Sequence, residues 1–293
     1  MLLTIAIPSY NRFEKLKSQL DQLLIVCNLS DFQFKIIVFD NHSTDKTSTL
    51  ASHEVFNIEF NKFITNERNL GLVGNLRRCI EYVDTEFLWM LGDDDPIIID
   101  ELLKAIKELH ANKFRSSINL IFFNPITLDN KLNSERGYID DKIEQDKLFD
   151  SNIISEIRSI DPVLTFWISA FWIRGGVAKK IVENQKIHPE NLMLPLYLVG
   201  KSIMSGKATY WNISIVKHRL EQDSWSGRYG KLVYWLDYPE VVLSLLNEGL
   251  PVNCFSDFME NNRYSFRKTA SLLQKYPSSF KRVWNVHKKW IFS

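Results

Sequence analysis

Three consecutive carboxylates are the clearest chemical signal in this sequence. Asp93, Asp94 and Asp95 follow an apolar run at residues 87–91, with Gly92 between the two. Adjacent carboxylates repel one another, and a hard divalent cation such as Mg²⁺ or Mn²⁺ relieves that repulsion. Such a cation commonly binds one or two carboxylates together with substrate phosphates. The triplet is therefore a candidate metal and phosphate site, although an exposed acidic turn in which Asp94 or Asp95 caps the next helix explains it equally well.

Two other polar segments lie beside predicted elements: one follows an apolar run, and the other precedes a helical pattern. Asp40 and Asn41 come after residues 36–39, and a carboxylate there could accept hydrogen bonds from a nucleotide base or ribose. The segment 69–75 contains two glycines before a helical pattern. Glycine permits close backbone approach, and helix N-termini favour phosphate. A helix N-cap at residues 43–44 and an ordinary glycine-containing loop are the plainer alternatives.

These clusters must be positioned by the elements around them. Strands are expected at 2–7, 34–39, 57–63, 86–91 and 118–123, and helices at 11–26, 43–51, 72–83 and 98–111. The alternation predicts an α/β fold with a mainly parallel, Rossmann-like sheet flanked by helices on both faces. Ligands bind beyond the carboxyl ends of such strands, so the polar clusters should meet at one edge of the sheet.

The second half of the chain is less clearly patterned. A long connection is expected over 124–160, with a short helix near 151–158, followed by an aromatic stretch at 166–172. Helices are expected at 176–184 and 190–204 and a strand at 208–216, and the sequence looks helical from 229 onward.

Four segments together resemble the family 2 inverting glycosyltransferases of the GT-A fold. They are Ile7-Pro8-Ser9-Tyr10-Asn11-Arg12, Val38-Phe39-Asp40-Asn41-His42-Ser43-Thr44-Asp45, Asn69-Leu70-Gly71-Leu72-Val73-Gly74-Asn75 and Leu91-Gly92-Asp93-Asp94-Asp95. Their order and spacing over residues 2–123 are those of the family. The resemblance implies transfer of a sugar, with inversion, from a nucleoside-diphosphate sugar to the hydroxyl of a saccharide acceptor. It also implies a role in bacterial surface polysaccharide assembly, such as O-antigen or capsule, where the acceptor is often lipid-linked.

The resemblance also assigns roles by position. The donor would be bound by Pro8, Ser9, Tyr10, Arg12, Asp40, Asn41, Arg68, Asn69, Asn75, Asp93 and Asp94. Asp95 is the first choice for the Mn²⁺ or Mg²⁺ ligand, with Asp93 beside it, because the triplet is similar to the DXD element of the family. The commoner form of that element has an aspartate where this chain has Gly92. His218, in a segment similar to a donor-side loop, is a candidate third ligand or a structural histidine.

The catalytic base is expected near residue 190. His188-Pro189-Glu190-Asn191-Leu192 looks like the family segment in which a Glu-Asp pair opens a helix. Asn191 replaces the second carboxylate and cannot take a proton, so the role of general base falls to Glu190. The alternative is that Glu190 only favours a helix N-terminus.

The resemblance implies a GT-A domain at 1–225 and a helical C-terminal extension at 226–293. The domain would have a nucleotide-sugar-binding half at 1–123 and an acceptor half at 124–225. Two rival functions stay open. One is a nucleotidyltransferase, which would favour a glycine-rich basic loop after the first strand. The other is a catalytically inactive homologue that binds a sugar or a partner, which Asn191 makes plausible.

Charge and composition limit the partners and the cellular location that are expected for the protein. The net charge of +1 provides no global field that would attract nucleic acid. The three cysteines are widely spaced, which fits a reducing cytoplasm. The sequence contains no apolar run of about 18 residues, so no segment is expected to span a bilayer. Residues 268–290 interleave basic and aromatic side chains. This pattern suits either peripheral docking at the inner face of the cell membrane or packing of a C-terminal helix with its lysines in water.

Overall fold

The computed structural model describes residues 1–129, 134–137, 143, 147–160, 162–219, 230, 232–255, 274 and 279–291. Its centre is a seven-stranded sheet of order β3-β2-β1-β4-β8-β5-β9. The strands are β1 (Leu3–Ser9), β2 (Lys35–Asp40), β3 (Lys62–Thr65), β4 (Phe87–Met90), β5 (Ile118–Phe123), β8 (Phe171–Arg174) and β9 (Lys207–Trp211). Within this sheet β8 runs antiparallel to both of its neighbours, whereas every other pairing is parallel.

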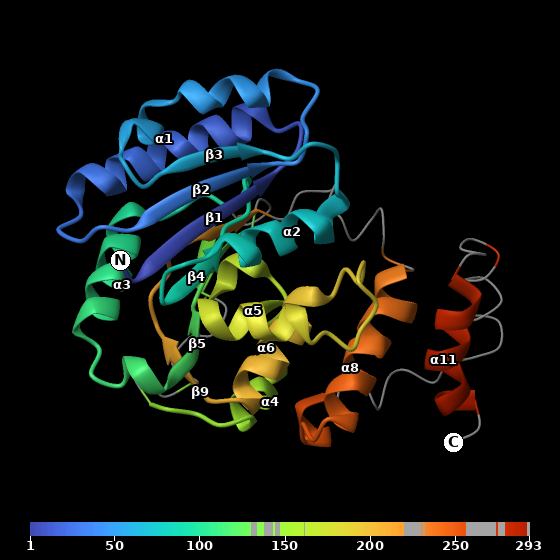
Figure 1. Cartoon of the computed structure of the whole chain (residues 1–293). Coiled ribbons are helices and arrows are strands. Elements are labelled where there is room, and N and C mark those ends of the chain that lie inside the picture. Colours follow the sequence, from blue (N-terminus) through green and yellow to red (C-terminus); the bar gives the residue numbers. More distant parts are fainter. Residues whose placement is uncertain are drawn as a thin grey trace.

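Helices cover both faces of the sheet, as the sequence predicts (Figure 1). One face carries α1 (Phe13–Leu29) and α3 (Ile99–Ala111), and the other carries α2 (Gly71–Tyr82), α5 (Gly175–Glu183) and α6 (Leu194–Met204). Side chains of β1 alternate between the two layers: Ile5 and Ile7 pack with α1 and α3, and Ala6 packs with α2. Burial on both faces explains why these strands read as continuous apolar runs.

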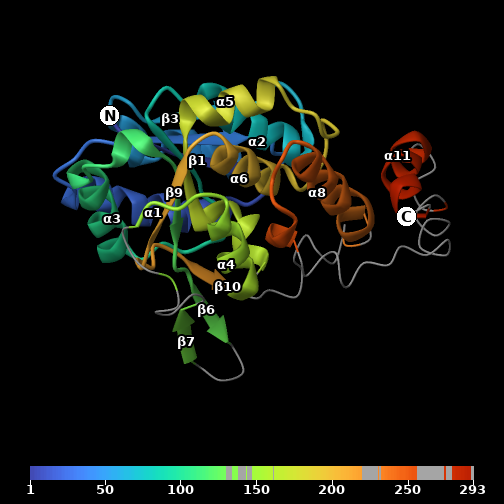
Figure 2. The same ribbon diagram turned by 90° about the horizontal axis from the view of Figure 1, so that it is seen from below.

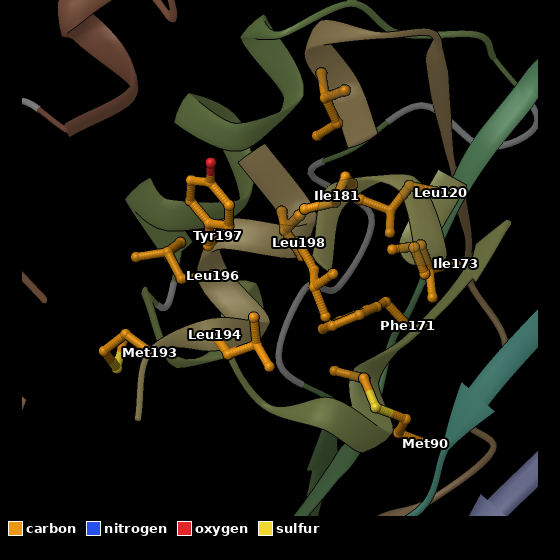
Figure 3. Packing of buried hydrophobic residues seen from close by; sticks show 14 of the residues in the cluster. Met90, Leu120, Phe171, Ile173, Ile181, Met193, Leu194, Leu196, Tyr197 and Leu198 are labelled. Atoms are coloured by element: carbon orange, nitrogen blue, oxygen red, sulfur yellow. The ribbon is translucent and has the colours of Figure 1, made fainter. Parts of the chain in front are cut away.

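The core between the sheet and α2, α5 and α6 continues into the C-terminal half of the chain. Leu194 and Leu198 of α6 point into the same cluster as Met90, Phe171 and Ile173 of the sheet (Figure 3). A β-carbon at Gly200 would lie 2.5 Å from a methyl carbon of Leu245, so glycine allows α8 (Tyr238–Asn247) to approach α6 closely.

The strand expected at 208–216 is β9, which already ends at Trp211. Two elements expected in the first hundred residues also differ from those observed. The predicted strand 57–63 is replaced by the 3₁₀ helix η2 (Glu54–Asn57) and by β3, which begins at residue 62. The side chain of Asn61 explains the late start, because its Oδ1 accepts from Ile36 N (2.8 Å) and its Nδ2 donates to Val55 O (2.9 Å). The predicted helix 43–51 is the 3₁₀ helix η1 (Lys46–Ser52), capped by Asp45 rather than by residues 43–44.

The stretch 124–160 is also more structured than expected. It contains β6 (Ile126–Asp129) and β7 (Ser134–Gly137), which join β10 (Lys217–Arg219) in a second sheet of order β10-β6-β7. The β6–β7 hairpin projects away from the body of the molecule (Figure 2). The short helix expected near 151–158 is α4 (Asn152–Ile160). Further 3₁₀ turns are η3 (Arg115–Ser117), η5 (Pro162–Thr165), η6 (Ile168–Ala170) and η8 (Val252–Phe255).

The described part of the C-terminal region is helical, in agreement with the sequence. A π-helical turn, η7 (Val233–Asp237), runs directly into α8, and α11 (Phe280–Ile291) packs against both. Val283 and Val286 of α11 form a small core with Leu236. Among the described residues, none of the helices combines the length and the apolar character that crossing a bilayer requires.

Candidate functional site

The carboxyl ends of β1, β2 and β4 lie side by side at one edge of the sheet. Ser9 is in register with Asp40, and Ala6 is in register with Met90. The hydroxyl of Ser9 donates to Asp93 Oδ2 (2.7 Å), so the end of β1 contacts the acidic triplet directly. The polar clusters therefore meet, as the parallel topology predicts.

The three aspartates of the triplet have different surroundings. Asp93 and Asp95 are each only 8% exposed, whereas the side chain of Asp94 is 38% exposed. Asp94 Oδ2 forms ion pairs with Arg12 Nη1 (2.7 Å) and Lys15 Nζ (3.5 Å) of the β1–α1 segment. Arg12 Nη1 is also 4.0 Å from Asp93 Oδ1. The first turn of α1 thus supplies positive charge to the partly exposed side of the triplet.

Asp95 is held by residues that precede β8. Its Oδ2 accepts from Ser169 Oγ (2.6 Å) and from Trp167 Nε1 (2.9 Å). The same Ser169 hydroxyl accepts from Gly92 N (2.9 Å) and so links both ends of the triplet turn. The sequence indicated an aromatic stretch here but did not identify Trp167 and Ser169 as partners of the triplet.

The two buried carboxyls have raised pKa values. Burial raises the pKa of Asp93 to about 7, with the Ser9 hydrogen bond opposing the rise and the charge of Asp94 adding to it. Burial likewise raises the pKa of Asp95 to about 6, against the hydrogen bond from Ser169. Two carboxyls that are unfavourable as isolated anions are a suitable pair to face a cation.

A divalent cation fits this donor set when its shell is completed from outside the protein. Among the described residues, no group of three or more His, Cys, Asp and Glu side chains is arranged to hold a metal ion. Asp93 and Asp95 both use Oδ2 for their hydrogen bonds to Ser9, Trp167 and Ser169. Mg²⁺ is commonly bound by one or two carboxylates plus substrate phosphates and water, which is the share that Asp93 and Asp95 can supply.

Gly92 is required by the conformation of the triplet. A β-carbon at this position would lie 2.5 Å from Asp95 Oδ2 and 3.1 Å from Asp95 Cγ. Any larger residue would therefore displace the Asp95 carboxylate from Ser169 and Trp167. This contact favours glycine over any larger residue at position 92.

The loops after β1 and β2 are joined to each other. Asn11 and His42 have left-handed backbones, with φ of 52° and 65°. Asn11 N donates to Ser43 Oγ (2.8 Å), and Asn11 Oδ1 accepts from Thr44 N (2.7 Å). Next to this junction lies an open cavity of ≈ 420 Å³ lined by residues 11–15 together with Asp45 and Lys46. Tyr10, before the junction, is exposed.

Asp40 is fully buried and is already partnered. Ser43 N donates to Asp40 Oδ1 (3.2 Å), and the Ser43 hydroxyl donates to the same oxygen. The carboxylate expected to contact a nucleotide thus also shapes the loop that follows β2.

Four asparagines near the ends of β2 and β3 and the start of α2 form a network of amide hydrogen bonds. Asn41 Nδ2 donates to Asn69 Oδ1 (2.9 Å), and Asn41 Oδ1 accepts from Leu70 N (2.8 Å). Asn66, which sequence reasoning did not single out, donates from Nδ2 to both Asn41 Oδ1 (3.1 Å) and Asn75 Oδ1 (2.9 Å). The network fixes the loop that leads into α2.

Arg68 differs from these asparagines. It is exposed, and within the described part of the chain it makes no hydrogen bond or ion pair. The structure therefore leaves Arg68 available to a ligand, whereas Asn41 and Asn75 are buried and hold the loops.

Glu190 lies on the loop between α5 and α6. It is exposed, and its backbone N donates to His188 Nδ1 (3.2 Å). Helix α6 begins at Leu194, four residues later than the helix expected at 190–204. Glu190 lines a cavity of ≈ 870 Å³ between this loop, α8 and α11. No hydrogen bond or ion pair among the described residues joins Glu190 to the triplet.

Asn191, in contrast, is completely buried. Its Nδ2 donates to Glu240 Oε2 (2.8 Å) and to Asp237 O (3.0 Å), and its Oδ1 accepts from Met193 N (2.8 Å). A carboxylate here would face a second carboxylate and a carbonyl oxygen with no hydrogen to donate. This environment favours an amide over an acid at position 191.

His218 belongs to β10, in register with Thr127 of β6. The neighbouring Lys217 N donates to Pro96 O (2.8 Å), so the backbone of β10 lies beside the residue that follows the triplet. The side chain of His218 is outside the described residues, and its role as a metal ligand stays a prediction.

Comparisons with known proteins agree with this architecture. The model of the family "Glycosyl transferase family 2" matches residues 4–160. TarS 1–349 of S. aureus in complex with UDP-GlcNAc superimposes with a TM-score of 0.65 at 15% identity, over 99% of this chain and 81% of that chain. No curated protein sequence matches the chain.

Two further structures are similar at comparable identity. The mannosyltransferase PcManGT from Pyrobaculum calidifontis, in complex with GDP-Man and Mn²⁺, has a TM-score of 0.60 at 12% identity, over 94% of this chain and 75% of that one. Glucosyl-3-phosphoglycerate synthase from Mycobacterium tuberculosis, in complex with Mn²⁺, UDP and glucosyl-3-phosphoglycerate, has a TM-score of 0.53 at 12% identity, over 85% and 81% of the two chains. These likenesses establish the fold. Because the family match also covers more than half of the 293 residues, the chain belongs to glycosyl transferase family 2 and has the GT-A fold.

Proposed function

We propose that this protein transfers a sugar from a nucleoside-diphosphate sugar to an acceptor hydroxyl with inversion at the sugar carbon. The observation that carries the proposal is the pair of buried carboxylates, Asp93 and Asp95, at the carboxyl edge of the sheet in a family 2 domain. The family match favours sugar transfer over nucleotidyl transfer. Asn191 is buried among hydrogen-bond acceptors, which is a structural reason for an amide at this position. The presence of Asn191 therefore does not favour an inactive homologue.

The donor would bind along the edge formed by β1, β2 and β4. The turn at 8–10 would contact the base and ribose, and Arg12 and Arg68 would face the diphosphate. Asp40, which is fully buried, would support the nucleotide site by shaping the loop after β2. Asn41, Asn69 and Asn75 would act by holding the loop at 69–71 in place. Asp94 would contact the donor while paired with Arg12 and Lys15.

Asp93 and Asp95 would hold Mn²⁺ or Mg²⁺, and His218 would be the third ligand. A bound divalent cation would stabilise the negative charge that develops on the departing diphosphate. Ser9, Ser169 and Trp167 would keep both carboxylates oriented before the donor arrives. Two of the similar proteins have Mn²⁺ in their structures.

Glu190 would take the proton from the acceptor hydroxyl as that oxygen attacks the sugar carbon. Inversion requires the attacking oxygen and the diphosphate to lie on opposite faces of the sugar. Because α6 runs directly into β9, which is parallel to β5, the N-terminal end of α6 points toward the carboxyl edge of the sheet. This direction supports the proposal that the loop carrying Glu190 lies on the side of the domain where the donor would bind.

Metal-dependent nucleotide binding tests the proposal. Thermal unfolding would be followed with UDP, GDP, CDP and dTDP, each with and without Mn²⁺, because ligands that bind the native state raise its stability. We expect one nucleotide to raise the unfolding temperature in the presence of Mn²⁺, and Asp95→Ala to abolish the increase.

Asp100→Ala is the matched control, since Asp100 is an exposed carboxylate in the first turn of α3. It should respond to nucleotide as the parent does. A folded Asp95→Ala protein that responds equally well would remove the triplet from the mechanism.

The setting that we propose is bacterial surface polysaccharide assembly, in O-antigen or capsule, on the cytoplasmic side of the cell membrane. A lipid-linked saccharide acceptor would explain a membrane contact through 268–290. In α11 the inner face carries Val283 and Val286, while Trp284 is 47% exposed and Lys281 is also exposed. An exposed tryptophan beside a lysine suits a headgroup interface better than it suits helix packing alone.

We also propose the division into a GT-A domain at 1–225 and a C-terminal extension at 226–293. The extension would serve the acceptor side of the reaction, because α8 and α11 border the cavity that Glu190 lines. Its helix α8 nevertheless shares the main core through Val241, Val242 and Leu245.

A further inference from the structure

Two acidic residues at the start of α8 hold the loop that carries Glu190. Glu240 Oε1 accepts from His188 N (3.2 Å), and Asp237 Oδ2 accepts from Leu192 N (3.0 Å). These backbone amides lie on either side of Glu190 in the chain. The loop is thus fixed at both ends by carboxylates from a helix that follows it by about fifty residues.

Asn191 adds a third connection between the same partners. Its side chain donates to Glu240 Oε2 (2.8 Å) and to Asp237 O (3.0 Å). On the opposite side of the loop, Arg77 of α2 donates to Pro189 O (3.3 Å). The loop is therefore clamped between α2 and α8, and Glu190 projects from it into the cavity.

Arg282 of α11 forms ion pairs with both carboxylates. Arg282 Nη2 lies 2.5 Å from Asp237 Oδ1, and Arg282 Nε donates to Glu240 Oε2 (2.8 Å). Asp237 is completely buried, and the side chain of Arg282 is only 14% exposed. Removing one member of a buried ion pair leaves an uncompensated charge, so the two acids depend on this arginine.

Arg282 and Glu190 also border the same cavity. This cavity has a volume of ≈ 870 Å³ and lies between the loop, α8 and α11. Two chains of hydrogen bonds connect Arg282 to the loop, one through Glu240 to His188 and the other through Asp237 to Leu192.

We propose that Arg282 is a positioning residue that keeps the 188–192 loop, and with it Glu190, in the geometry needed for transfer. It acts through Asp237 and Glu240 and does not itself touch the reacting atoms. The inference rests on the proposed function, because Glu190 is the candidate base of that reaction. It gives the C-terminal helix a part in catalysis that is independent of any membrane contact.

Arg282→Met, which keeps the length of the side chain but removes its charge, tests the proposal in the full-length protein. Lys281→Met is the matched control, since Lys281 is the preceding residue of α11 and is exposed. Hydrogen exchange of the peptide covering 186–193 would be measured first, without ligand. We expect exchange at His188 and Leu192 to become at least about tenfold faster in Arg282→Met and to stay unchanged in Lys281→Met, because exchange follows local opening.

Steady-state transfer provides the second readout. Displacing a catalytic group by about 1 Å can lower turnover by ~10²-fold, so kcat of Arg282→Met should fall by about 10–100-fold. KM for the donor and the affinity for UDP or GDP with Mn²⁺ should not change, because the donor edge is formed by other elements. Arg282→Lys, which restores the charge but not the forked geometry, should recover part of kcat, and it serves in place of Arg282→Met if the latter does not fold.

The outcomes separate this proposal from the proposed function. Loop exchange equal in Arg282→Met and Lys281→Met would overturn the positioning role, whatever the activity. A loosened loop with unchanged kcat would overturn it as well, since the loop would then not contribute to transfer. Absence of Mn²⁺-dependent nucleotide binding in the parent protein would instead count against the proposed function, and hydrogen exchange would still decide whether Arg282 holds the loop.

Discussion

Exchanging Asn191 for aspartate would replace one buried nitrogen by oxygen without changing the shape of the side chain. That nitrogen donates to Glu240 Oε2 (2.8 Å) and to Asp237 O (3.0 Å), so the new oxygen would face two acceptors. The hydrogen bond from Met193 N to Oδ1 would remain. Asn191→Asp thus removes two hydrogen bonds and places a third carboxyl group beside Asp237 and Glu240.

The size of the effect follows from these contacts. Two unit charges 2.8 Å apart repel by about 6 kcal/mol at an effective dielectric constant of about 20. Protonation avoids the repulsion, but at pH 8 it costs about 5–6 kcal/mol for a carboxyl with an ordinary pKa of about 3.9. Arg282 offsets part of either cost. We therefore expect Asn191→Asp to lose about 3–5 kcal/mol of unfolding free energy at pH 8, the usual effect of an uncompensated buried charge.

The loss should depend on pH in a defined direction. The folded pKa of the new carboxyl is raised above its unfolded value, so stability is lost as pH rises above about 4. At pH 5 protonation costs only about 1.5 kcal/mol, and the protonated group can donate to Glu240 as the amide did. Burial also raises the pKa of Asp237 to about 6 in the parent, so parent and variant are compared at the same pH.

Urea unfolding of parent and variant at pH 5 and pH 8, followed by circular dichroism, measures the difference. Asn191→Ala is the control: it removes the same donors without adding charge, so its loss should be nearly equal at the two pH values. If Asn191→Asp loses less than about 1 kcal/mol at pH 8, or loses as much at pH 5, the assignment of Asn191 to the Asp237–Glu240 cluster is refuted.

Three other changes test the site. Gly92→Ala should weaken Mn²⁺-dependent nucleotide binding by about 10–100-fold, because the added β-carbon meets the Asp95 carboxylate. Gly176→Ala is the control: its added carbon meets nothing within 4 Å, so this variant should bind nucleotide as the parent does. Glu190→Gln should lower turnover by about 10²–10⁴-fold in a transfer assay with unchanged nucleotide affinity, and near-normal turnover would move the role of base to another group. Trp284→Ser should reduce co-sedimentation with anionic phosphatidylglycerol vesicles, and equal binding would contradict membrane docking by α11.

The sheet was largely predictable from the sequence, and the exceptions have identifiable causes. β1, β2, β4 and β5 are short apolar runs because both of their faces are covered. β8 has only four residues and follows two 3₁₀ turns, and its antiparallel direction is decided by partners on β4 and β5 rather than by its own residues. β3 starts late because one side chain, Asn61, takes the place of backbone pairing.

The candidate site was predictable only in part, for similar reasons. The motif residues of the first ninety-five positions lie at one edge, as parallel strands require. Trp167 and Ser169 reach Asp95 from more than seventy residues away, and no local pattern indicates such a contact. The role of Asn191 likewise depends on α8 and α11: the sequence indicated a missing acid, and the structure has an amide that donates to Glu240.

The place of β8 in the chain also constrains how the protein assembles during synthesis. β3, β2, β1 and β4 are contiguous in the sheet and complete once residue 90 has been made. β5 is made next, yet β8 must separate it from β4, and β8 ends only at Arg174. Until then the nascent chain carries apolar strands with unpaired edges, which are prone to aggregation. A pause in synthesis between residues 91 and 174 would therefore prolong the exposure of these edges.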